Sequence, residues 1–64
     1  MWRKYIEVNL DGKRIGVYAI ALGRLNEPVP LKDYYEEARR CSIEDGLVSA
    51  DDASKLDFKE VLSA

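Results

Sequence analysis

The fold is decided by the first third of the chain, where residues 2–22 read WRKYIEVNLDGKRIGVYAIAL. Apolar side chains alternate with other residues at even positions: Trp2, Ile6, Val8 and Leu10. This period of two is typical of a β-strand, whose side chains point to two faces in turn. Asp11-Gly12 is the dipeptide best suited to a type I′ turn, because both central residues need a positive φ. The stretch therefore predicts an N-terminal β-hairpin.

The register of this hairpin follows if Asp11 and Gly12 are its two loop residues. Lys13 then lies opposite Leu10, and each step away from the turn adds one pair. The apolar face pairs Val8 with Ile15, Ile6 with Val17, Lys4 with Ala19 and Trp2 with Ala21. The other face pairs Asn9 with Arg14, Glu7 with Gly16, Tyr5 with Tyr18 and Arg3 with Ile20. This second face is amphipathic, and we expect its two tyrosines to contact each other across the strands.

The residues after the hairpin predict a connection and one helix. Pro28 and Pro30 cannot donate to a β-ladder, so the second strand should end near Leu22. Asp33 and Glu36 have the spacing of a capping box and Gly46 is a natural stop, which predicts a helix from Lys32 or Asp33 to Asp45. The side expected to pack on the hairpin carries Leu31, Tyr34, Tyr35, Ala38 and Cys41. We also expect an ion pair between Glu36 and Arg40, four residues apart.

The last third of the chain allows two interpretations. Leu56-Asp57-Phe58-Lys59 alternates like a strand before Glu60-Val61 breaks the pattern. A helix from Ala50 to Leu62 is the alternative, but its apolar residues spread too far round a helical wheel to form one stripe. We favour the strand. Residues 1–64 are then a single α+β domain of ββαβ order, with an antiparallel sheet and one helix packed on one face.

Composition limits the class of protein. The chain has 64 residues, 47% of them hydrophobic and 34% charged, which is the composition of one small globular domain. The longest apolar run, residues 17–22, is too short for a membrane span or for the apolar part of a secretory signal. A single cysteine cannot form an internal disulfide. We therefore expect a soluble protein located in the cytoplasm.

The sequence lacks the residues that common catalytic chemistry needs. There is no histidine, so triads of the Ser-His-Asp or Cys-His type cannot form within one chain. Cys41 lies on the expected buried side of the helix and is predicted to be a structural thiol. The glycines do not form a phosphate-binding loop, and the acidic residues do not have the spacing of a calcium loop. We expect no enzyme activity, catalytic residue, cofactor, metal site or small-molecule substrate.

The distribution of charge favours an interaction module. Residues 1–30 carry five basic and three acidic side chains (net +2), whereas residues 31–64 carry five basic and nine acidic ones (net −4). A basic hairpin in one copy can therefore meet the acidic half of another. We expect a homodimer or a complex with a protein partner, formed through the hairpin sheet. The expected contact residues are Arg3, Tyr5, Arg14, Tyr18 and Ile20.

Nucleic-acid binding is the alternative function. A hairpin face with Arg3, Arg14, Tyr5 and Tyr18 offers cations for phosphates and rings for bases, as an accessory or regulatory protein would need. The net charge of −2 and the isoelectric point near 5.0 disfavour it, because nucleic-acid-binding domains are usually strongly basic.

Overall fold

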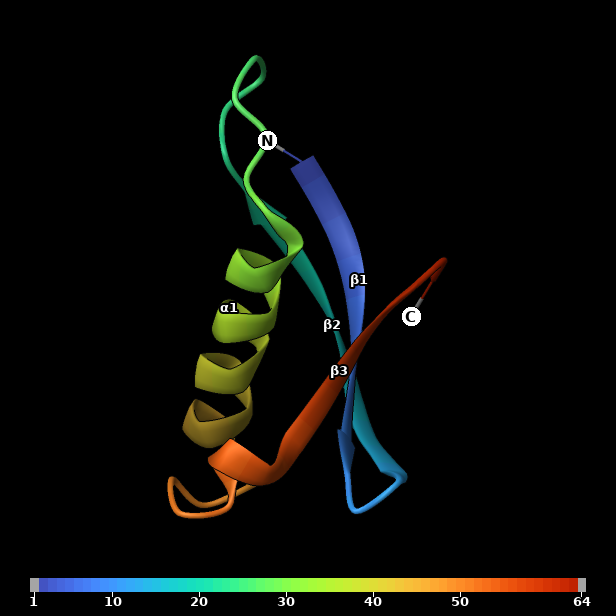
Figure 1. The fold of residues 1–64 in the computed structure, drawn as a ribbon, viewed down its shortest axis with the longest axis vertical. Helices are drawn as coiled ribbons and strands as arrows, with labels where there is room; N and C mark the ends of the chain where they lie inside the picture. The colour runs from blue at the N-terminus through green and yellow to red at the C-terminus, as the bar shows by residue number, and fades with distance from the viewer. Residues whose placement is uncertain (1, 64) are drawn as a thin grey trace.

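The computed structural model describes residues 2–63 and has the predicted ββαβ order. Its elements are β1 (Trp2–Leu10), β2 (Lys13–Leu22), α1 (Leu31–Glu44), the short 3₁₀ helix η1 (Ala53–Lys55) and β3 (Leu56–Val61). The strands form one antiparallel sheet in the order β2-β1-β3, with α1 alongside it (Figure 1). The α+β class is confirmed, and the last third of the chain contains the third strand that we favoured over a helix.

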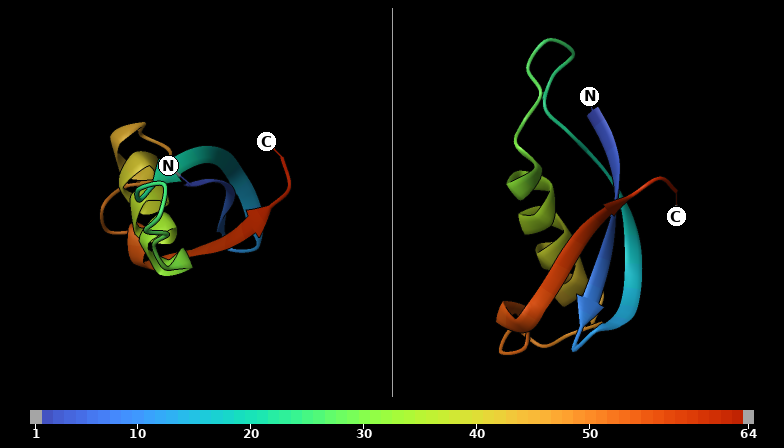
Figure 2. Two further views of the ribbon diagram at one scale, coloured as in Figure 1. Left: turned by 90° about the horizontal axis from the view of Figure 1, so that it is seen from above. Right: turned by 45° about the vertical axis from the view of Figure 1, so that its right-hand side comes forward.

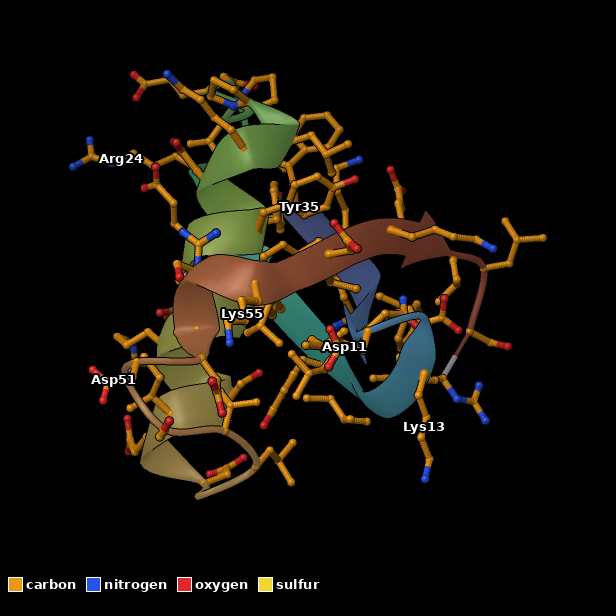
Figure 3. The ribbon with its side chains drawn as sticks, turned by 60° about the horizontal axis from the view of Figure 1, so that its bottom comes forward. Asp11, Lys13, Arg24, Tyr35, Asp51 and Lys55 are labelled. Atoms are coloured by element: carbon orange, nitrogen blue, oxygen red, sulfur yellow. The ribbon has the colours of Figure 1, made fainter. Side chains whose placement is uncertain are left out.

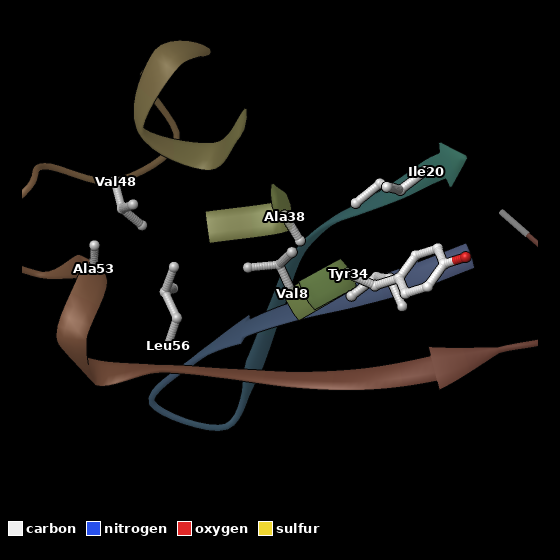
Figure 4. Packing of buried hydrophobic residues seen from close by; sticks show 8 residues of the cluster. Val8, Ile20, Tyr34, Ala38, Val48, Ala53 and Leu56 are labelled. Carbon is white, nitrogen blue, oxygen red and sulfur yellow. The ribbon is translucent and has the colours of Figure 1, made fainter. Parts of the chain in front are cut away.

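The sheet curls around the helix. Seen from above, β2 and β3 curve to either side and α1 lies on the concave side (Figure 2). The core fills the space between them, and Ile6 and Val8 of the central strand are fully buried in it. Val8 lies close to Tyr34 and Ala38 of α1 (Figure 4). Within residues 2–63, no element covers the convex face of the sheet. This outer face therefore has no second layer.

The turn of the hairpin forms as predicted. Asp11 and Gly12 have φ angles of 53° and 80°, and Leu10 pairs with Lys13 and Asn9 with Arg14. Beyond that point the predicted register is wrong. Val8 pairs with Gly16 instead of Ile15, so β2 contains one extra residue and a β-bulge lies at this position.

The bulge turns the following residues of β2 over to the other face. The observed pairs are Glu7 with Val17, Ile6 with Tyr18, Tyr5 with Ala19, Lys4 with Ile20, Arg3 with Ala21 and Trp2 with Leu22. The larger side chains of Tyr18, Ile20 and Leu22 consequently point toward α1 and pack in or against the core. In the predicted register, Ala19 and Ala21 would lie there and would leave much of that space empty. The turn residues alone therefore do not determine the register, because the register also depends on which side chains fill the space under α1.

The helix spans nearly the predicted residues but begins differently. It starts at Leu31 after Pro30, and no side chain caps its first turn, so the predicted capping box of Asp33 and Glu36 is wrong. Asp33 is the third helical residue, where its backbone N–H donates to the Pro30 carbonyl (3.0 Å). Its buried residues are Tyr34, Ala38 and Ser42, with Leu31, Tyr35 and Cys41 only partly buried. The buried face of the helix is therefore centred on Tyr34, Ala38 and Ser42, slightly shifted from the predicted face.

The connection between β2 and α1 is a structured loop. Arg24 and Glu27 exchange two backbone hydrogen bonds, and the Trp2 indole N–H donates to the Arg24 carbonyl at 2.7 Å. Gly23 has a φ of 80°, and a Cβ there would lie 2.7 Å from the Glu27 carbonyl oxygen. Only glycine fits this position. The loop thereby holds Val29 beside the end of β2.

Among residues 2–63, neither the 14-residue α1 nor the three-residue η1 has the length and apolarity needed to cross a bilayer.

Candidate interaction surface

The five predicted contact residues are divided between the two faces of the sheet. Arg3, Tyr5 and Arg14 lie on the outer face. Tyr18 and Ile20 lie on the face that packs against α1, so the predicted placement of these two residues is wrong. Ile20 is only 6% exposed and belongs to the core. The cause is the bulge, which moves the last seven residues of β2 by one step.

Tyr18 links β2 to the end of the helix. Its hydroxyl donates a hydrogen bond of 2.7 Å to Oδ2 of Asp45, the C-cap residue of α1. Burial, together with the hydrogen bond to Asp45 and its negative charge, raises the pKa of Tyr18 to about 12. The predicted contact with Tyr5 does not form, since Tyr5 lies opposite Ala19. Tyr18 therefore does not share the outer face with Arg3, Arg14 and Tyr5, as the nucleic-acid alternative assumed.

The outer face carries a short apolar strip. Tyr5 lies at its centre, between Ala19 on β2 and Val61 on β3. Toward the hairpin turn the strip becomes polar, because Arg14 lies 3.8 Å from Glu7, measured from Nη1 to Oε1. Most of the strip is half-buried by its own neighbours. It offers a partner a limited apolar area.

One edge of the sheet is formed by β2. This strand has ten residues and pairs only with β1 among the strands of residues 2–63. Residues 17–22 read VYAIAL and contain no charge. In an antiparallel strand, every second residue points its N–H and C=O away from the neighbouring strand. Strand β2 therefore presents backbone donors and acceptors along an apolar edge.

The other edge is formed by β3, which is shorter and charged. Its six residues include Asp57, Lys59 and Glu60, all three exposed. Glu60 accepts a hydrogen bond from Lys4 at 3.4 Å, between Nζ and Oε2. Charged side chains and short length are devices that keep an edge strand from pairing with other chains.

An open groove lies where β2 ends beside the helix. Its volume is about 430 Å³. The apolar part comes from Leu22, Gly23 and Val29, and the helix contributes the charged residues. These are Asp33, Glu36, Glu37 and Arg40. Three carboxylates and one guanidinium thus border an apolar floor at the end of the β2 edge.

The single cation of this groove is already engaged. Arg40 pairs with Glu37 and Glu44 along the helix, in place of the predicted pair with Glu36. The Arg40 guanidinium lowers the pKa of the Glu37 carboxyl. Asp33 and Glu36 form no ion pair within residues 2–63. The groove therefore keeps negative charge that this part of the chain does not neutralise.

The lone thiol and the acidic residues do not form a further site among residues 2–63. Cys41 is half-buried, and burial raises the pKa of its thiol, which favours the unreactive protonated form. No group of three acidic or cysteine side chains in the described part of the chain comes together in a way that could hold a metal ion.

No protein-family model matches this chain, and no curated protein or solved structure shows significant similarity to it.

Sequence reasoning missed the β2 edge and the groove for separate reasons. The apolar run at residues 17–22 predicts a strand, but it does not show whether that strand lies at an edge of the sheet. The position of β3 beside β1, which leaves β2 at an edge, depends on a long-range pairing. Asp33 and Glu36 were assigned to helix capping, and only the observed helix start places them beside Leu22.

Proposed function

We propose that this protein is a small non-catalytic interaction module that associates with a second copy of itself through the hairpin sheet. The observation that carries the proposal is the edge of β2, which has ten residues, a six-residue apolar run and, within residues 2–63, a single neighbouring strand. A long apolar edge of this kind is a template for pairing with another chain. The charged β3 edge makes β2 the favoured site of contact.

The size of the contact sets its strength. Ten residues at about 3.3 Å each make an edge about 33 Å long, and with a height of about 10 Å each copy buries about 300 Å². The two copies together then bury about 600 Å², whereas stable interfaces bury about 1,200 Å² or more in total. The proposed dimer therefore belongs to the weak, transient class. Association should then depend on protein concentration and has to be measured up to about 1 mM.

The test places one lysine on each edge of the sheet. Ala19 on β2 and Val61 on β3 both lie on the outer face and flank Tyr5. Ala19→Lys puts two like charges near each other wherever the β2 edges meet, and should weaken the dimer about tenfold or more. Val61→Lys is the matched control and should leave the dimer intact. Sedimentation equilibrium of both variants and of the natural protein measures this.

Three outcomes would reject the proposal. A mass that stays near 7.3 kDa over the whole concentration range shows no self-association. Equal weakening by Ala19→Lys and Val61→Lys shows that copies meet through the outer face instead of the edge. Weakening by Val61→Lys alone assigns the contact to β3.

A further inference from the structure

We propose that two copies pair their β2 strands antiparallel about a two-fold axis, and that Lys13 of each copy enters the acidic groove of the other. This inference rests on the proposed self-association and identifies its interface. It joins the β2 edge, which begins at Lys13 beside the hairpin turn, with the groove bordered by Asp33 and Glu36.

The direction of the strands brings these features together. Strand β2 begins at Lys13 and ends at Leu22. In an antiparallel pair related by a two-fold axis, the first residues of one strand lie beside the last residues of the other. Lys13 of one copy is therefore placed beside Leu22 and Gly23 of the second, where the groove lies. The symmetry repeats the same contact at the other end of the pair.

Lys13 and the groove also lie on the same face of the sheet. Lys13 pairs with Leu10, a residue of β1 that packs against the core on the α1 side of the sheet. Leu22 also packs against that core and lines the groove. The Lys13 side chain is exposed and extends away from the hairpin end (Figure 3). Its ammonium group can therefore approach the groove from the same side as the helix.

The charge of Lys13 is complementary to the charge of the groove. Asp33 and Glu36 form no ion pair within residues 2–63, and neither does Lys13. The neighbouring Arg14 lies on the outer face, where Glu7 already faces it at 3.8 Å. Lys13 is the residue at which β2 begins, so antiparallel pairing brings this cation to the two carboxylates. Parallel pairing would instead bring the two Lys13 residues together and separate both from the grooves.

The experiment exchanges the two charges between copies. Lys13→Glu and Glu36→Lys each turn two attractions of the dimer into two repulsions, and each variant alone should dimerise about tenfold more weakly or worse. An equimolar mixture of the two variants restores both contacts, because Lys13 then meets Glu36 and the new lysine meets the new glutamate. The mixed dimer should therefore form within about threefold of the natural affinity.

Two controls accompany the exchange. Lys55→Glu changes the net charge as Lys13→Glu does, but at η1, where Lys55 contacts Asp52, and it should leave the dimer unchanged. Far-ultraviolet circular dichroism shows whether each variant is folded. The double variant with Lys13→Glu and Glu36→Lys in one chain should dimerise like the natural protein, even if one single variant folds poorly.

The outcomes separate this inference from the function on which it rests. A natural protein that stays monomeric to about 1 mM rejects both. A natural dimer with unaltered single variants rejects only the groove contact and leaves self-association standing. Weakened single variants that are not rescued by mixing or by the double variant also overturn the inference, since their effect is then not due to paired charges.

Discussion

The two edge strands of this sheet share a neighbour and differ in almost everything else. Both β2 and β3 pair antiparallel with β1. Strand β3 has six residues with exposed charges at Asp57, Lys59 and Glu60, whereas residues 17–22 of β2 carry none. Natural sheets protect their edges with charges and short strands. Because residues 17–22 of β2 lack such charges, this stretch is the edge that we propose for pairing with a second copy.

The two edges are also attached to the helix in different ways. Phe58 of β3 stacks on Tyr35 of α1, with ring centroids 5.4 Å apart. Strand β2 is held by Ile20 in the core and by the hydrogen bond from Tyr18 to Asp45. The inner face of each strand is thus fixed by contacts with α1 or with the core. The difference lies in what the edge itself offers to solvent.

The largest effect is expected when two of the three charges of β3 are removed. Changing Asp57 and Lys59 together to Val makes the outer face of β3 apolar and leaves Glu60, which pairs with Lys4 on the other face. A chain with two pairing edges can add copies without limit. Light scattering should then show masses well above a dimer that grow with time. A double variant that keeps the mass distribution of the natural protein would show that the charges of β3 do not protect it.

A smaller effect is expected when the hydrogen bond between Tyr18 of β2 and Asp45 is removed. Tyr18→Phe loses the hydrogen bond to Asp45 and should cost about 1 kcal/mol of unfolding free energy at neutral pH. The Tyr35–Phe58 contact of β3 is a ring stack and is not broken by this change. Chemical denaturation of both proteins measures the difference.

The pH dependence of that difference has a definite sign. The pKa of Tyr18 is raised to about 12 in the folded protein, from an unfolded value of 10.0, so the folded state holds the proton more tightly. Its contribution is fully present below pH 10 and is lost as the pH rises from about 10 to about 12. The stability advantage of the natural protein over Tyr18→Phe should shrink across that range. An advantage that stays constant would contradict the assigned hydrogen bond.

Local signals predicted the elements of the fold well. The alternation around Ile6 and Val8, the turn at Asp11-Gly12 and the alternation at Leu56 to Lys59 gave the three strands and their order. These features work because side-chain period and turn geometry are set by a few neighbouring residues. The helix was placed within one residue at its C-terminal end for the same reason.

The candidate site could not be predicted in the same way. The bulge at Gly16 depends on which side chains fill the space under α1, and one added residue moved Tyr18 and Ile20 from the outer face to the core. The groove depends on the loop that brings Val29 beside Leu22 and on where the helix starts. Both are consequences of tertiary packing, which local sequence does not specify.

Amide hydrogen exchange tests most directly whether copies meet at the β2 edge. Exchange should be followed by NMR at about 20 µM and about 1 mM, which brackets the range expected for a weak interface. If copies pair there, the amides within residues 17–21 that point away from β1 become protected at the higher concentration, while those at the outer edge of β3 do not change. Unchanged exchange along β2, or protection that appears at β3 instead, would contradict this pairing.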